Sequence, residues 1–176
     1  MHEPGGPAPA HARLFIALWP GPQVRRRLLD WRAACDWPAG ARPVRAADLH
    51  LTLHFIGRVP VERLPELVDG LAVPFRRFEL HFGRAEVWGR GTAVLHPRTA
   101  PQRLVELHAQ LRQALVRLGL PVEQRSFRPH VTLARDARGA RLAGAAPAWR
   151  WSVHGYVLAQ SRPGSAGGYR VLWRYR

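Results

Sequence analysis

Short apolar runs, separated by Pro and Gly, recur along most of the chain and predict strands interspersed with helices. Alternating apolar positions and β-branched or aromatic residues indicate strands, whereas apolar residues at three- and four-residue steps indicate helices. Strands are predicted at 13–19, 49–56, 92–96, 150–161 and 169–175, one or two within 75–88, and another within 126–135. Helices are predicted at 22–35, 62–71 and 101–118.

The order of these elements predicts the fold class. Several neighbouring strands are linked by too few residues for the crossover that a parallel pair needs. At least part of the sheet is therefore expected to be antiparallel, which favours an α+β fold over a doubly wound parallel sheet. No Gly-rich phosphate loop of Rossmann or P-loop form follows a predicted strand, so a nucleotide-fuelled mechanism lacks its usual sequence support.

The remaining segments define the limits of the domain. Residues 1–12 are rich in Pro, Gly and Ala and are expected to form a flexible tail. Residues 13–176 are long enough for one hydrophobic core and too short for two comfortable domains, so a single domain is expected. Within it, residues 136–148 are rich in Ala, Gly and Arg and are expected to form an exposed loop.

A repeated tetrapeptide carries the chemical information. His50-Leu51-Thr52-Leu53 and His130-Val131-Thr132-Leu133 both lie within apolar, strand-like runs. The chain has nine His but only four Thr, and half of those Thr lie in the two tetrapeptides. Two matched copies in matched contexts indicate a functional pair, although a lone His-x-Thr would more often be a structural feature of a half-buried strand.

The spacing places the polar residues of each motif together. Side chains alternate between the two faces of a strand, so His50, Thr52 and His54 are expected on one face. In the same way His130 and Thr132 are expected to share a face. Two such strands can face each other across a cleft and present two imidazoles and two hydroxyls to one substrate.

These groups suit metal-independent cleavage of a phosphodiester. Near neutral pH one imidazole can act as the base while the other, protonated, acts as the acid. The hydroxyls of Thr52 and Thr132 can donate hydrogen bonds to phosphate oxygens. A zinc site is the alternative, but the chain has no His-Glu-x-x-His pattern and no Cys cluster, so no metal is expected.

Composition bears on the partner and the compartment. All 27 basic residues are Arg, and the 12 acidic residues leave a formal net charge of +15, which favours a polyanion such as nucleic acid as partner. A GC-rich genome can explain the choice of Arg over Lys, but not the excess of bases over acids. A single Cys35, no apolar run long enough to span a membrane and no signal-peptide pattern indicate a cytoplasmic protein without membrane contact.

Longer stretches around the motifs resemble a known family. RLFIALWP precedes the first motif, HLTLHFIG contains it, FRPHVTLAR contains the second, and VLAQSRPGSAGGYRVLWRYR closes the chain. In these stretches the chain resembles the RNA 2′,3′-cyclic phosphodiesterase family, formerly called 2′-5′ RNA ligases, of the two-histidine phosphoesterase superfamily. The resemblance covers about residues 13–175, and the family's common acidic residue is replaced here by Gln160.

The resemblance implies a fold and a reaction. The fold would be α+β and bilobal, with two pseudo-symmetric lobes that each have an antiparallel sheet and outer helices around a central cleft. The reaction would hydrolyse an RNA-terminal 2′,3′-cyclic phosphate to a 2′-phosphomonoester without a cofactor, with weak reverse 2′-5′ ligation. A monomer is expected.

The resemblance also assigns the residues of the site. His50 and His130 would be the catalytic pair, with His50 as the acid, and Thr52 and Thr132 would hold the phosphate. Arg135 would bind the substrate phosphate or stack on the terminal base. Two other interpretations stay open: a small cyclic phosphate as substrate, and a basic RNA-binding module without activity.

Overall fold

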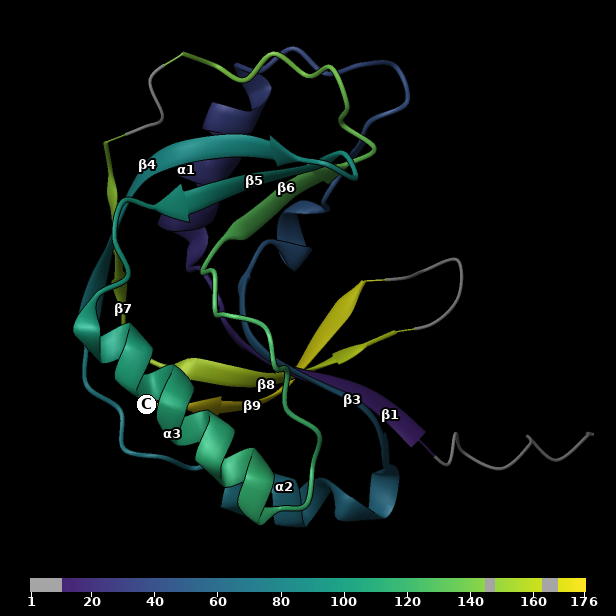
Figure 1. Cartoon of the computed structure of the whole chain (residues 1–176), viewed down its shortest axis with the longest axis vertical. Coiled ribbons are helices and arrows are strands. Elements are labelled where there is room, and N and C mark those ends of the chain that lie inside the picture. The colour runs from purple at the N-terminus through teal and green to yellow at the C-terminus, as the bar shows by residue number, and fades with distance from the viewer. Residues whose placement is uncertain (1–10, 145–147, 163–167) are drawn as a thin grey trace, which may run out of the picture.

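The computed structural model describes residues 11–144, 148–162 and 168–176, which form one mixed structure of strands and helices (Figure 1). The strands are β1 His11–Leu18, β2 Arg42–Pro43, β3 Leu51–Pro60, β4 Phe78–Trp88, β5 Thr92–Pro97, β6 Val131–Arg135, β7 Arg150–Val153, β8 Tyr156–Ser161 and β9 Tyr169–Tyr175. The helices are α1 Pro22–Ala33, α2 Leu64–Gly70 and α3 Gln102–Arg117, with short 3₁₀ turns η1 Ala46–Asp48 and η2 Val61–Arg63.

The strands form two antiparallel halves that meet at one point. Their order is β7-β4-β5-β6-β3-β1-β8-β9, with β2 paired to β6. Strand β6 ends one half and β3 begins the other, and the structure joins them through the pairing of Leu51 with Val131. The α+β, bilobal and antiparallel fold predicted above is confirmed, with the two sheets continuous at this junction.

Each half of the sheet is covered by one helix, and the strand that precedes this helix in the sequence belongs to the other half. Helix α1 follows β1 but lies beside β4, β5 and β6, whereas α3 follows β5 but packs beside β3, β8 and β9 (Figure 1). The Arg32 guanidinium of α1 donates hydrogen bonds to the carbonyl oxygens of Val44 and Leu133, which ties this helix to β6. The chain crossings therefore hold the two lobes together beyond the single strand junction.

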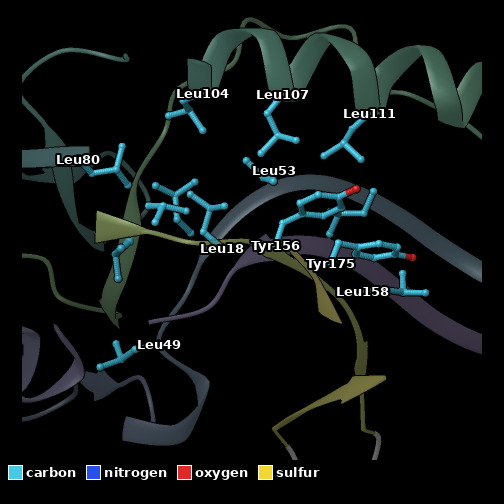
Figure 2. Packing of buried hydrophobic residues seen from close by; sticks show 14 of the residues in the cluster. Leu18, Leu49, Leu53, Leu80, Leu104, Leu107, Leu111, Tyr156, Leu158 and Tyr175 are labelled. Atoms are coloured by element: carbon cyan, nitrogen blue, oxygen red, sulfur yellow. The ribbon is translucent and has the colours of Figure 1, made fainter. Parts of the chain in front are cut away.

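The core of the second half forms beneath α3. Leu104, Leu107 and Leu111 point from one face of this helix toward Leu53 and Tyr156 (Figure 2). All five side chains are almost fully buried. Burial of a leucine stabilises the fold by about 1.5–3 kcal/mol, so this stripe anchors α3 on the strand that carries the first motif. The predicted helix at 101–118 is confirmed.

Glycine and bulged positions explain where the strand predictions fail. The strand expected at 49–56 continues through Gly57, whose φ of 86° bends the chain without ending it, to Pro60. In the same strand, Thr52 pairs with Ala17 and His54 with Ile16, so Leu53 is the extra residue of a bulge. His54 therefore turns into the core and Phe55 to the outside, which corrects the expected face of His54.

Two further segments differ from prediction. The strand expected at 150–161 is two strands, β7 and β8, which pair with β4 and β1 in different halves and are separated by His154 and Gly155. His11 and Ala12, expected as part of the tail at 1–12, belong to β1. Residues 1–10 lie outside the described part of the chain.

The segment expected as an exposed loop is partly packed. Ala137 is fully buried against Ala93 and Ala134, and Asp36 forms a bridge with Arg141. The prediction of an exposed loop is therefore wrong for this part, because its small side chains fit against β5 and β6. Residues 145–147 lie outside the described part. No helix among the described residues is long and apolar enough to cross a membrane.

Candidate functional site

The structure brings the two tetrapeptides together at the junction of the lobes. His50 and His130 directly precede β3 and β6, and the first residues of these strands, Leu51 and Val131, pair with each other. In an antiparallel pair, the residue before one partner lies beside the residue after the other. The junction thus brings His50 toward Thr132 and His130 toward Thr52, within one site.

A backbone carbonyl two residues earlier orients each imidazole. Nδ1 of His50 lies 2.6 Å from the carbonyl oxygen of Asp48, and Nδ1 of His130 lies 2.7 Å from that of Arg128. A carbonyl can only accept, so Nδ1 carries the proton in both rings. The nitrogen of each ring that is left for another partner is therefore Nε2, and for His50 it lies 3.0 Å from the Thr52 hydroxyl.

Aromatic rings enclose His50. The indole of Trp19 stacks on the imidazole at 5.4 Å between centroids, and Phe15 and Tyr169 contact it at 5.0 and 5.1 Å. Beneath them, the buried carboxylate of Asp48 accepts the backbone N–H of Tyr169 at 3.0 Å. The β8–β9 hairpin thus completes the pocket of a histidine that lies far earlier in the chain.

A polar network supports His130 instead. The edge of Trp88 meets the imidazole at 4.5 Å, and the indole Nε1 donates to Glu86 at 2.8 Å. The same carboxylate oxygen lies 2.8 Å from Nε2 of His96 and 3.2 Å from the guanidinium of Arg128. Nδ1 of His96 donates to the carbonyl of Pro129 at 3.1 Å, next to His130 in the chain.

Most of these supporting residues have no signal in the sequence. Trp88, Glu86 and His96 lie on β4 and β5, far from both tetrapeptides, and only strand pairing brings them to His130. One signal was present in the sequence: the stretch RLFIALWP, before the first motif, contains Phe15 and Trp19, two of the aromatic residues that surround His50.

Burial lowers the pKa of both imidazoles, but their charged neighbours differ. For His50 the Asp48 carboxylate opposes this shift, whereas His130 and Arg135 add to it. For His130 the charges of His96, Arg128 and Arg135 all lower the pKa further. Arg135 therefore acts on both rings, although its own side chain is exposed at the end of β6.

The remaining polar residues of the motifs are placed as follows. Thr52 and Thr132 are both half-buried, one at the start of each strand. His54 does not belong to the site: its Nε2 lies 2.9 Å from the carbonyl of His108, and the two rings stack at 4.0 Å. Among the described residues, no three His, Cys, Asp or Glu side chains are grouped as metal ligands would be.

Comparison with known proteins agrees with this fold and site. The family model of the 2′-5′ RNA ligase superfamily matches residues 20–162. A protein of Escherichia coli strain K12 named RNA 2′,3′-cyclic phosphodiesterase is 37% identical, and the match covers 80% of each chain. A protein of the same name from Thermus thermophilus is 31% identical, over 93% of this chain and 89% of the relative.

Solved structures give the same result. The crystal structure of E. coli LigT in apo form superposes with a TM-score of 0.84 at 32% identity, covering 94% of this chain and 97% of that one. The structure of LigT with 3′-AMP gives a TM-score of 0.85 at 31% identity, with the same coverage.

These findings define the class of the chain as a phosphoesterase with the LigT-type fold. It belongs to the 2′-5′ RNA ligase superfamily, within which its curated relatives are RNA 2′,3′-cyclic phosphodiesterases. The family and the class of enzyme predicted from the sequence are confirmed.

Proposed function

We propose that this protein hydrolyses the 2′,3′-cyclic phosphate at the end of an RNA to a 2′-phosphomonoester, with His50 and His130 as the catalytic pair. The observation that carries the proposal is the matched orientation of two imidazoles, each with Nδ1–H bound to a backbone carbonyl, which leaves Nε2 as the nitrogen for proton transfer; in His50 this atom lies beside the Thr52 hydroxyl. The RNA and the cyclic phosphate come from the names of the relatives.

In the proposed reaction His130 is the general base and His50 the general acid. Nε2 of His130 takes a proton from water while the water oxygen bonds to phosphorus. The bond between phosphorus and the 3′-oxygen breaks, and Nε2–H of His50 protonates that oxygen. The product keeps the phosphate on the 2′-oxygen, and each proton transfer contributes ~10²–10⁴-fold to the rate.

The charged neighbours support this division of roles. An acid must hold its proton, and although burial lowers the pKa of His50, the Asp48 carboxylate opposes that shift. A base must be free of its proton, and His96, Arg128 and Arg135 lower the pKa of His130. The two nearly identical motifs thus acquire different roles from what surrounds them.

The hydroxyls and Arg135 would hold the phosphate. Thr52 and Thr132 donate to its non-bridging oxygens, on which negative charge builds in the transition state, and Arg135 adds a positive charge at the mouth of the site. We propose no metal or cofactor for this step. The same groups would also support weak 2′-5′ ligation, in which the 5′-hydroxyl of a second RNA takes the place of water. It loses its proton to His130 and bonds to phosphorus, the bond from phosphorus to the 3′-oxygen breaks, and His50 protonates that oxygen, so that a 2′-5′ phosphodiester remains.

The setting proposed for the enzyme follows from the sequence. We propose that it works as a monomer in the cytoplasm on RNA ends, without membrane contact. The single cysteine, Cys35, is buried and unpaired, which is compatible with a reducing compartment.

The test is hydrolysis of an RNA ending in a 2′,3′-cyclic phosphate, in the presence of EDTA. We expect a product whose terminal phosphate becomes removable by phosphatase, and periodate should leave that 2′-phosphorylated end intact. The double variant H50A/H130A is the control for contaminating nuclease. Activity that needs an added metal, or a 3′-phosphate product, would contradict the proposal.

A further inference from the structure

A second cavity lies beside the proposed catalytic centre. It has a volume of about 330 Å³ and is formed by the turn after β1, the start of α1, the β7–β8 turn and the end of β9. Trp19 belongs to both places, because its indole stacks on His50 and also lines this cavity. Trp19 therefore connects the lining of the cavity with the surroundings of His50.

The strand register shows that the cavity and the site share one face of the sheet. Thr52 of β3 pairs with Ala17 of β1, which pairs with Val157 of β8. Val157 in turn pairs with Arg174 of β9, and both line the cavity. Directly paired residues of antiparallel strands lie on the same face, and each strand adds about 4.8 Å, so Arg174 lies roughly 14 Å from Thr52.

The lining of the cavity is basic. Its lining residues include Arg174, Arg176 and His154, and no Asp or Glu is found among the described residues that line it. Arg174 is exposed at this position. A guanidinium at an open cavity, next to an indole wall, is suited to a phosphodiester whose sugar or base packs on the aromatic ring.

The walls of the cavity are fixed by packing. A Cβ at Gly155 would lie 2.1 Å from the carbonyl oxygen of Tyr175, so the β7–β8 turn lies directly on the backbone of β9. The rings of Tyr156 and Tyr175 stack at 4.5 Å, as Figure 2 shows, and the Tyr175 hydroxyl donates to the carbonyl of Val68. The cavity is therefore preformed, which reduces the cost of ordering it on binding.

We propose that this cavity is a subsite for the RNA chain that precedes the cyclic phosphate, with Arg174 bound to an upstream phosphodiester. The inference rests on the proposed function. A nucleoside 2′,3′-cyclic phosphate has a single phosphate, which lies at the two histidines, and offers no second phosphate to Arg174, three strands away from Thr52. An oligonucleotide has further phosphates on its 5′ side and can reach Arg174 past Trp19.

The test compares two variants of β9 on substrates of two lengths. Arg174→Gln removes the charge in the cavity, and Arg170→Gln removes an equally exposed charge on the same strand outside the cavity. For Arg174→Gln we expect the ratio of kcat/KM on a short oligonucleotide to kcat/KM on a nucleoside cyclic phosphate to fall by about tenfold. Arg170→Gln should leave this ratio as in the wild type, and Arg174→Lys should restore part of it.

A binding measurement separates failure of the subsite from failure of the proposed reaction. The affinity for a fluorescent oligonucleotide with a 2′-phosphate end is measured by anisotropy, which needs no turnover. Weaker binding by Arg174→Gln than by Arg170→Gln would support the subsite even if the wild type cleaved no cyclic phosphate. Equal binding by the two variants, or an equal loss of kcat/KM on both substrate lengths, would overturn it.

Discussion

At the scale of single residues, two imidazoles receive the same orientation from the backbone and different properties from their neighbours. The carbonyls of Asp48 and Arg128 fix the tautomer of His50 and His130, so no side-chain carboxylate is needed for that purpose. Charge then distinguishes them: a carboxylate lies near His50, and cations lie near His130. Mutation of these charged neighbours should therefore change the pKa of one histidine more than that of the other, which allows the acid and the base to be distinguished.

Loss of either histidine should abolish most turnover. His50→Ala and His130→Ala each remove one proton-transfer group, so kcat should fall by at least ~10²-fold. His81→Ala, at an exposed position on β4, is the matched control and should keep wild-type activity. Circular dichroism and the unfolding midpoint check that each variant folds. Near-wild-type kcat in either variant would rule out a two-histidine mechanism.

The threonine hydroxyls should contribute less than the imidazoles. Thr52→Val and Thr132→Val keep the β-branched shape and remove one hydrogen bond to a charged oxygen, which corresponds to roughly 10–150-fold in kcat/KM. Because Thr52 also contacts Nε2 of His50, its variant should in addition shift the pH profile. Unchanged steady-state kinetics in both variants would assign these hydroxyls a structural role.

The pH profile should reveal which histidine is the acid. Because kcat/KM reports the free enzyme, and burial lowers the pKa of both imidazoles, its bell-shaped optimum should lie on the acidic side of the usual imidazole range. Asp48→Asn removes the charge that raises the pKa of His50 but keeps an oxygen for the N–H of Tyr169. If His50 is the acid, the alkaline limb moves to lower pH.

The pH profile of Asp48→Asn also has an outcome that would reverse the assignment of acid and base. If the acidic limb moves instead, His50 is the base and the proposed roles are reversed. Asp30→Asn, at an exposed position of α1, controls for the change in net charge and should leave both limbs in place.

At the scale of elements, local patterns predicted the helices and both motifs, whereas long-range pairing decided the rest. The leucines of α3 repeat at helical spacing, and the two tetrapeptides repeat in strand contexts, so both were visible in the sequence. The bulge at Leu53 was not visible in the sequence, because it depends on how β3 pairs with β1. For the same reason the Glu86 network behind His130 could not be predicted: its members lie on different strands.

The bulge also creates a contact between β3 and α3, through which the stability of the fold should depend on pH. It turns His54 toward α3, where the rings of His54, His108 and Phe127 stack in series at 4.0 Å. This stack connects the strand after His50 with the segment that leads to His130. Burial, together with the charges of His54 and Arg112, lowers the pKa of His108 to about 4.

The stability of the fold should therefore decrease as pH falls. His108 binds a proton in the unfolded chain near its usual pKa of about 6.5 but resists it when folded, so stability present at neutral pH is lost between that value and about 4. His108→Phe keeps the stack and removes the titration. The free energy of unfolding of the wild type should fall between about pH 7 and about pH 5. In His108→Phe this fall should be smaller by about 1 kcal/mol. Parallel pH profiles of urea unfolding would contradict this assignment.

At the scale of the whole molecule, His50 and His130, the proposed catalytic pair, belong to lobes that meet at one strand junction and are held by crossed helices. This arrangement brings the two histidines together, and Arg135 acts electrostatically on both of them. The formal net charge of +15 far exceeds what the two motifs need, and Arg174 extends it along the face of the second lobe. Such a field attracts a polyanion before it acts on one terminal phosphate.

Substrate capture should accordingly depend on salt in proportion to RNA length. Each phosphate that an arginine neutralises releases a condensed counterion, so the logarithm of kcat/KM should fall with the logarithm of salt by about 0.7 per contact on single-stranded RNA. A nucleoside cyclic phosphate has one phosphate and should give a shallow slope, whereas the slope should steepen with each added nucleotide until the basic surface is filled. Measurements on a series of cyclic-phosphate-ended oligonucleotides, at fixed pH, provide the slopes. If long RNA were as insensitive to salt as the mononucleotide, the excess of arginine would reflect genome composition and the active site alone would select the substrate.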